Sequence, residues 1–152
     1  MRLTFNLCII FSMVELLGCG PTELKSVIPA NSEIVSTYAD GKPKAIKVYT
    51  ETNGAKEWTG EIQFHKNGTK SIEGAIKNGL HEGEWISWYD DGSLWSKGSF
   101  KNGIRDGRGI VYYRNGNIQI EGFYEKGERT GLWKSFDDEG NLISETDYSR
   151  GE

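Results

Sequence analysis

The chain has 152 residues and a net charge of −4, and 36% of its residues are hydrophobic. Phosphate binding requires a basic footprint, so this charge argues against a nucleic-acid partner. Only two histidines are present, which leaves few candidates for acid–base or metal chemistry, and the apolar share is low for a thick globular core. Twenty glycines and 12% aromatic residues indicate instead many tight turns between large side chains.

Residues 1–18 predict a lipoprotein signal peptide. Arg2 supplies a short positive segment, and residues 7–14 form an apolar stretch too short to span a bilayer. The stretch ends at LLGC, residues 16–19, which resembles the bacterial lipobox. In such signals the chain is cut before the cysteine and the cysteine is acylated, so the resemblance implies a membrane anchor at lipidated Cys19. An uncleaved N-terminal helix or an ordinary secretory signal is the alternative.

The segment after the predicted cleavage site favours an exposed tether. The residue after the cysteine is Gly20 and not an aspartate. In bacteria with two membranes, the absence of an aspartate at this position favours transport of a lipoprotein to the outer membrane. Cys8 would leave with the signal, so we expect no disulfide in the mature chain. Residues 19–32 are polar, contain two prolines and show no periodicity, which predicts a tether to a folded domain of residues 33–152.

A repeat of 24 residues dominates the C-terminal half. Three sets of glycines share this step: Gly79, Gly103, Gly127 and Gly151; Gly83, Gly107 and Gly131; Gly92, Gly116 and Gly140. Bulky residues keep the same register: Trp88, Tyr112 and Phe136; Leu94, Ile118 and Leu142; Phe100, Tyr124 and Tyr148. A period of this size predicts a stacked array of identical supersecondary units.

One unit, residues 83–103, has the pattern of a β-hairpin. Residues 83–89 and 93–100 are rich in aromatic and other strand-forming residues. Asp90, Asp91 and Gly92 predict the turn between them, and the Asn-Gly pair before the next unit predicts a second turn. The sequence therefore predicts an all-β fold, an elongated antiparallel meander of consecutive hairpins in a single twisted sheet.

The pattern continues upstream with lower regularity. Residues 64–76 match the register of residues 88–100, and residues 38–49 match with a step of 27, which places an insertion of three residues around Glu51–Trp58. About five hairpins result, of which the first is a divergent cap.

Strand alternation assigns the side chains to two faces. We expect Trp88 and Phe100 to share one face, with a ring from a neighbouring strand lying across the bare backbone of Gly98 and Gly122. The opposite face then carries a candidate binding surface: Trp85, Tyr89, Trp95, Tyr113, Phe123 and Trp133. Under this hypothesis the tryptophans can become serine without loss of the fold. The alternative is that these rings pack on each other to stiffen the sheet.

The spacing of residues 83–103 resembles the MORN-repeat variant family, with the motif G-x-W-x-x-W-Y-x-x-G-x-L-x-x-x-G-x-F-x-x-G. Two later copies follow it, with Gly109 in place of the first tryptophan in one and Trp133 keeping it in the other. The resemblance covers residues 38–148 and implies a hairpin-repeat sheet. Bacterial members are often catalogued as antitoxin-like proteins, and eukaryotic MORN proteins are linked to membranes, lipids and protein scaffolding.

Other polar residues favour structural roles. His65 and His81 lie beside turns with no partner for catalysis or metal binding in the sequence pattern. The acids at 90–91 and 137–139 lie in the turns themselves, where aspartate bonds its own backbone, and their spacing matches no calcium loop. We therefore expect no metal, no cofactor and no catalytic residue.

Three functions remain open. The first is a lipid-anchored envelope scaffold, non-catalytic, that binds the membrane through Cys19 and a protein partner in the envelope. The second is an antitoxin-like protein that neutralises a toxin by direct binding. The third is an envelope enzyme acting on glycans through acids such as Glu61, Glu84 or Asp106, although paired carboxylates at a useful separation are not readable.

Overall fold

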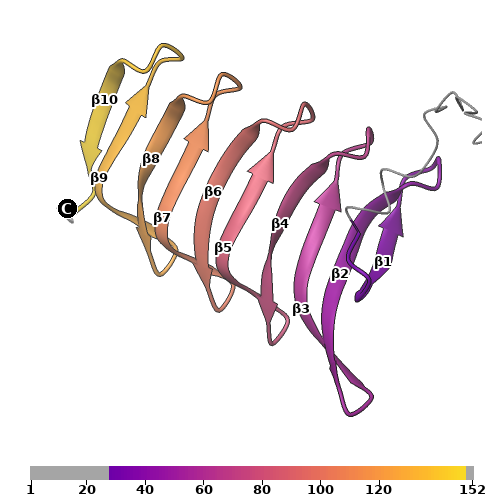
Figure 1. Cartoon of the computed structure of the whole chain (residues 1–152). Coiled ribbons are helices and arrows are strands. Elements are labelled where there is room, and N and C mark those ends of the chain that lie inside the picture. The colour runs from indigo at the N-terminus through magenta and orange to yellow at the C-terminus, as the bar shows by residue number, and fades with distance from the viewer. Residues whose placement is uncertain (1–27, 150–152) are drawn as a thin grey trace, which may run out of the picture.

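The computed structural model describes residues 28–149 and forms one open sheet of ten antiparallel strands, each paired with its neighbours in chain order (Figure 1). The strands are β1 Ser32–Thr37, β2 Pro43–Thr52, β3 Ala55–Phe64, β4 Lys70–Lys77, β5 Leu80–Trp88, β6 Leu94–Lys101, β7 Ile104–Tyr112, β8 Ile118–Glu125, β9 Glu128–Phe136 and β10 Leu142–Asp147. The predicted all-β meander of five hairpins is confirmed. The three-residue insertion lengthens β2 and β3 to 10 residues each, and their turn extends beyond the others on that edge (Figure 1).

The turns within hairpins have the predicted chemistry. The Tyr89 amide donates to the Ser93 carbonyl across 2.9 Å, and Gly92 has a φ of 86°, which a glycine adopts without strain. The Ser93 hydroxyl and amide both donate to Asp91 Oδ1, and these bonds lower the pKa of Asp91 to about 2. The turn role is therefore confirmed for Asp91, whereas the Asp90 carboxylate accepts a bond of 2.9 Å from Arg114 of the next hairpin.

The turns between hairpins are two-residue turns with positive φ at both positions: Asn53-Gly54, Asn78-Gly79, Asn102-Gly103 and Lys126-Gly127. Two positive φ values define the tight turn that matches strand twist, in which Asn-Gly is strongly preferred. Lys126 adopts a φ of 51° with a long side chain that gains no local backbone bond in this conformation.

We expect Lys126→Asn to raise the free energy of unfolding by about 0.5–1 kcal/mol, because asparagine tolerates the left-handed conformation better than lysine. Urea denaturation followed by circular dichroism measures this change. The reciprocal variant Asn102→Lys is expected to lower the free energy of unfolding by a similar amount. Equal stability of the wild type and both variants would contradict the conformational argument.

A β-bulge in each repeat changes which residues share a face. Ser87 pairs with Ser96 but Trp88 pairs with Leu94, so Trp95 is an extra residue in its strand. The same shift recurs between Val111 and Tyr112 on β7. A bulge reverses the alternation on either side of it.

The predicted sharing of a face by Trp88 and Phe100 is therefore wrong. Phe100 pairs with Gly83 and Gly98 pairs with Trp85, so Phe100 lies on the face of Trp85. Trp88, three residues after Trp85 in the same strand, points to the other face.

The described residues enclose only a small core. Six hydrophobic side chains are buried: Ile46, Ile62, Phe64, Ile76, Trp85 and Trp133. Three of them, Ile46, Ile62 and Phe64, form a cluster at the N-terminal end, against which Ile28 and Val48 pack. The rest of the sheet is one layer thick, so most side chains on both faces contact solvent.

A repeated hydrogen bond from a tyrosine joins neighbouring hairpins at the turn edge. The hydroxyls of Tyr38, Tyr89 and Tyr113 donate to carbonyls of the next hairpin, those of Phe64, Tyr112 and Phe136, across 2.7–2.9 Å. His65 takes the equivalent place, with Nε2 at 2.9 Å from the Trp88 carbonyl. The structural role expected for His65 is therefore confirmed, and each unit is stabilised by its neighbours.

Candidate binding site on the ring face

We call the face that carries Trp85, Phe100, Tyr124 and Trp133 the ring face. Ring centroids lie 6.2 Å apart for Trp85 and Phe100, and 5.0 Å apart for Tyr124 and Trp133. Tyr148 extends the row, 6.4 Å from Trp133. The T-shaped geometry of these pairs is the preferred arrangement of aromatic side chains.

Each tryptophan in this row lies flat on a glycine of the preceding strand. A Cβ added to Gly74 would lie 2.2 Å from the indole of Trp85, and one added to Gly122 would lie 2.2 Å from the indole of Trp133. Each indole N–H then donates across 3.1 Å to the carbonyl of the residue after the glycine, Ala75 or Phe123. The predicted ring over Gly122 is confirmed.

The six residues predicted to form one binding surface do not lie together. Trp85 and Trp133 are 7% and 5% exposed, so their rings are packing elements, as the alternative interpretation holds. Tyr89 and Tyr113 lie at turns with their hydroxyls engaged. The prediction of one shared face is wrong for Phe123, because it ignored the bulges.

The other two candidates are accessible but separated. Trp95, at the bulge, is 45% exposed and lines a hollow on the ring face. Phe123 is 51% exposed and follows Gly122, whose open side faces the ring face, so Phe123 lies on the opposite face.

The middle unit lacks the indole. Gly109 occupies the position of Trp85 and Trp133, and it pairs with Gly98 on one side and Gly122 on the other. The prediction of a ring over Gly98 is wrong, because a Cβ there would meet the Arg105 guanidinium instead, with Nη1 at 3.3 Å. Because Gly109 has no side chain where Trp85 and Trp133 have an indole, the ring face has unfilled space beside Gly109.

Two hollows of about 190 Å³ each lie on the ring face at this point. Ser96 and Arg105 line both of them. The first is lined by Trp95, Ser96, Lys97, Arg105, Gly109, Ile110, Val111, Ile120, Tyr124, Arg129 and Trp133; the second by Gln63, Ile72, His81, Trp85, Ser87, Ser96, Gly98, Phe100 and Arg105. Neither lining contains a carboxylate.

A column of cationic or imidazole side chains accompanies the rings at the 24-residue step: His81, Arg105 and Arg129. The His81 ring stacks on Trp85 at 3.6 Å, and the Arg129 guanidinium lies 4.2 Å from the Trp133 centroid. Arg105 lies between Phe100 and Tyr124, 5.3 and 5.2 Å from their centroids. Sequence reasoning missed this column, although its spacing was visible.

Arg105 is an accessible cation between the two hollows. It is exposed, and within residues 28–149 it makes no ion pair and no side-chain hydrogen bond. Its guanidinium carries five N–H donors in a planar fork that matches a carboxylate. The ring face therefore offers a cation with unused donors between two hollows.

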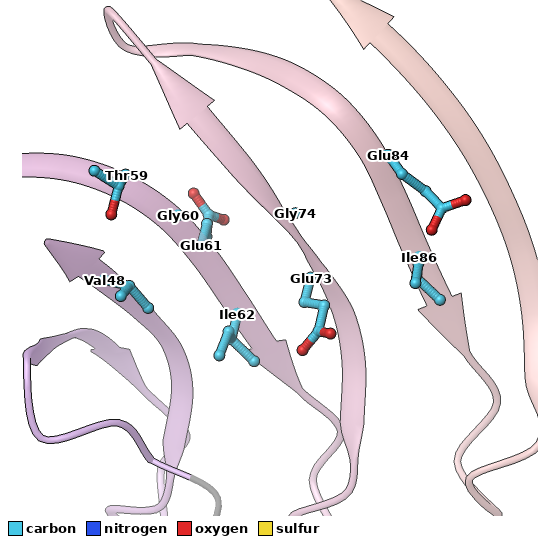
Figure 2. Close-up of a pocket in the computed structure, with 9 residues that line it drawn as sticks. All are labelled: Val48, Thr59, Gly60, Glu61, Ile62, Glu73, Gly74, Glu84 and Ile86. Atoms are coloured by element: carbon cyan, nitrogen blue, oxygen red, sulfur yellow. The ribbon is translucent and has the colours of Figure 1, made fainter. Parts of the chain in front are cut away.

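A third hollow, of about 270 Å³, is lined by Glu61, Glu73 and Glu84 together with Ile62 and Ile86. Figure 2 shows that the three carboxylates point in different directions. Glu61 accepts a bond of 2.7 Å from the Gln63 amide, and Glu73 pairs with Lys70.

The remaining acid proposed for an envelope enzyme lies elsewhere. Asp106 is outside the lining of the third hollow and accepts a 3.4 Å bond from the Lys126 amide at a turn. Residues 28–149 contain no cluster of histidine, cysteine or acidic side chains suited to a metal ion. The same residues contain no helical segment with the length and hydropathy of a membrane span.

The last unit ends differently from the others. Thr146 stands 24 residues after Gly122 and pairs with Trp133. A side chain here occupies the site on which the indole of a further unit would lie. Among the described residues β10 is the edge of the sheet, with Leu142 and Ile143 52% and 64% exposed.

The fold and the ring face define a class of protein, the open single-layer array of β-hairpin repeats. The family model described as MORN repeat variant matches three segments, residues 82–102, 105–126 and 129–149. Each match covers most of one hairpin, β5–β6, β7–β8 or β9–β10, so these three segments are similar to the repeats of that family. A search of curated proteins found no match to the chain.

Proposed function

We propose that this chain is a lipid-anchored cell-envelope protein whose repeat sheet is a non-catalytic scaffold for binding another protein. The observation that supports the proposal most is the ring face around Gly109, with exposed Trp95, two hollows and a guanidinium with unused donors. Aromatic residues and arginine are the side chains that most enrich and strengthen protein interfaces.

The anchor rests on the lipobox at residues 16–19, which lies outside the described residues. Acyl chains contribute about 0.8 kcal/mol per buried methylene, so two or three chains hold a protein firmly at a membrane. The tether of residues 19–32 meets the sheet at β1. The first hollow is lined by residues of β6 to β9, in the half of the sheet farther from β1.

Intact mass spectrometry of the native protein, recovered from membranes, tests the anchor. We expect a chain that begins at Cys19 and carries added acyl mass, and we expect Cys19→Ala to lose both the processing and the acyl mass. Cys8→Ala is the matched control and is expected to give the same mature mass as the wild type. An unmodified full-length chain in the soluble fraction would contradict the anchor and favour the antitoxin-like alternative, which is consistent with a cytosolic location.

Site-specific photo-cross-linking in intact cells tests the scaffold role. A photoreactive residue in place of exposed Trp95 is expected to trap one defined protein, whereas one in place of Ile143, on the edge strand, is expected to trap none. Growth rescue on co-expression with a toxin, and not envelope capture, is the outcome that the antitoxin-like alternative requires.

A further inference from the structure

We infer that the gap left by Gly109 receives an aromatic side chain of the partner protein, carried in an acidic segment. The inference rests on the proposed scaffold function and specifies the chemistry of the partner. Its basis is the difference between the middle unit and the units on either side.

The neighbouring units show how this sheet holds an indole. Trp85 lies flat on Gly74 and donates its N–H to Ala75, and Trp133 does the same with Gly122 and Phe123. In the middle unit the corresponding floor is Gly98, and the corresponding acceptor is the carbonyl of Ser99. No side chain within residues 28–149 donates to that carbonyl. The middle unit thus has the glycine on which an indole lies and the carbonyl that accepts its N–H, but it has no indole.

Only movable groups cover the floor. The Arg105 guanidinium lies over Gly98, at 3.3 Å from an added Cβ, and the Tyr124 ring edge lies 3.0 Å from an added Cβ at Gly109. An aromatic ring that enters over Gly98 displaces the Arg105 side chain outward. Arg105 then lies on that ring as Arg129 lies on Trp133, where the guanidinium is 4.2 Å from the ring centroid. The displaced arginine then gains a cation–π contact with the ligand.

Charge specifies what accompanies the ring. The cationic side chains on the ring face that line the two hollows are Arg105 and Arg129, and neither lining contains a carboxylate. Arg129 donates to the Tyr148 hydroxyl at 3.2 Å and, within the described residues, pairs with no acid. A segment with glutamate or aspartate beside its aromatic residue satisfies these donors, whereas a basic segment is repelled.

The probe is a short capped peptide, Glu-Trp-Glu with 5-fluorotryptophan, titrated into the full chain as purified from cells and followed by fluorine NMR. We expect its affinity to exceed that of the Lys-Trp-Lys peptide by about tenfold. Arg105→Glu, at an exposed side chain, is expected to reduce or reverse this preference. Equal binding of both peptides to the wild type would overturn the inference.

Gly109→Trp is the decisive variant, because it supplies the missing ring from within the chain. We expect it to abolish peptide binding and to raise the melting temperature, since the neighbouring units hold the same residue beside Phe100 and Tyr148. Unchanged binding in Gly109→Trp would overturn the inference. Should this variant fail to fold, the reversal by Arg105→Glu still decides the question.

The two proposals fail in different ways. Cross-linking to one envelope protein that is insensitive to Gly109→Trp, together with no peptide binding, would remove this inference and leave the scaffold function. If the peptide binds but the chain carries no acyl group and captures no envelope protein, the proposed function as an anchored scaffold is contradicted. The proposed site for an aromatic side chain at Gly109 would still stand.

Discussion

Replacing Gly122 by alanine is expected to lower the free energy of unfolding by about 3 kcal/mol. The added methyl would lie 2.2 Å from the indole of Trp133, which is buried and fixed by its N–H bond to Phe123. The added methyl must displace the fixed ring from the face of the sheet, and overpacking of this kind costs about 1–3 kcal/mol or more. Urea denaturation followed by circular dichroism measures the loss, and Gly74→Ala is expected to behave alike.

Gly98→Ala is the matched control, because it makes the same change at the equivalent position of the unit without an indole. Its methyl would meet only the end of the Arg105 side chain, at 3.3 Å, which can move aside. We expect a change within about 0.5 kcal/mol. An equal loss at Gly98 and Gly122 would show that the cost comes from the strand backbone and not from the ring.

Trp133→Ser is expected to lower the free energy of unfolding by about 3–5 kcal/mol, the range for removal of a buried tryptophan. The variant loses a ring that is 5% exposed, its packing on Tyr124 and the hydrogen bond to Phe123. Thermal and urea unfolding both report this loss. In a repeat array it is expected to affect the last two hairpins first, because each unit is stabilised by its neighbours.

Trp95→Ser is the comparison for Trp133, since Trp95 is 45% exposed at a bulge. We expect it to change the free energy of unfolding by less than about 0.5 kcal/mol while weakening partner capture. If Trp133→Ser instead left stability unchanged and abolished capture, Trp133 would be a contact residue and its packing role would be wrong.

The period of the sequence was sufficient to predict the meander, because turn glycines need particular backbone angles. Gly92 at a φ of 86° and Gly103 at 81° lie where the glycine pattern placed turns. The faces were not predictable from alternation alone. One extra residue, Trp95, reverses the alternation within its strand, and nothing in its identity distinguishes a bulge residue from a regular one.

The candidate site was predictable in part. The substitution of Gly109 for a tryptophan is visible in the aligned repeats, and so is the step between Arg105 and Arg129. That Arg105 lies over Gly98 follows only from the register between β6 and β7, in which Phe100 pairs with Arg105. The N-terminal cluster around Ile46 was not predicted, because the repeat pattern is weakest there.

Thr146 bears on how such an array can change in length over evolution. A hairpin duplicated inside the array finds a bare glycine on the strand before it, so its tryptophan has a place to lie. A hairpin appended after β10 meets a threonine side chain at that place. A duplicated hairpin that carries the tryptophan is therefore compatible with the fold inside the array, whereas the same hairpin placed after β10 requires a change of Thr146 to glycine.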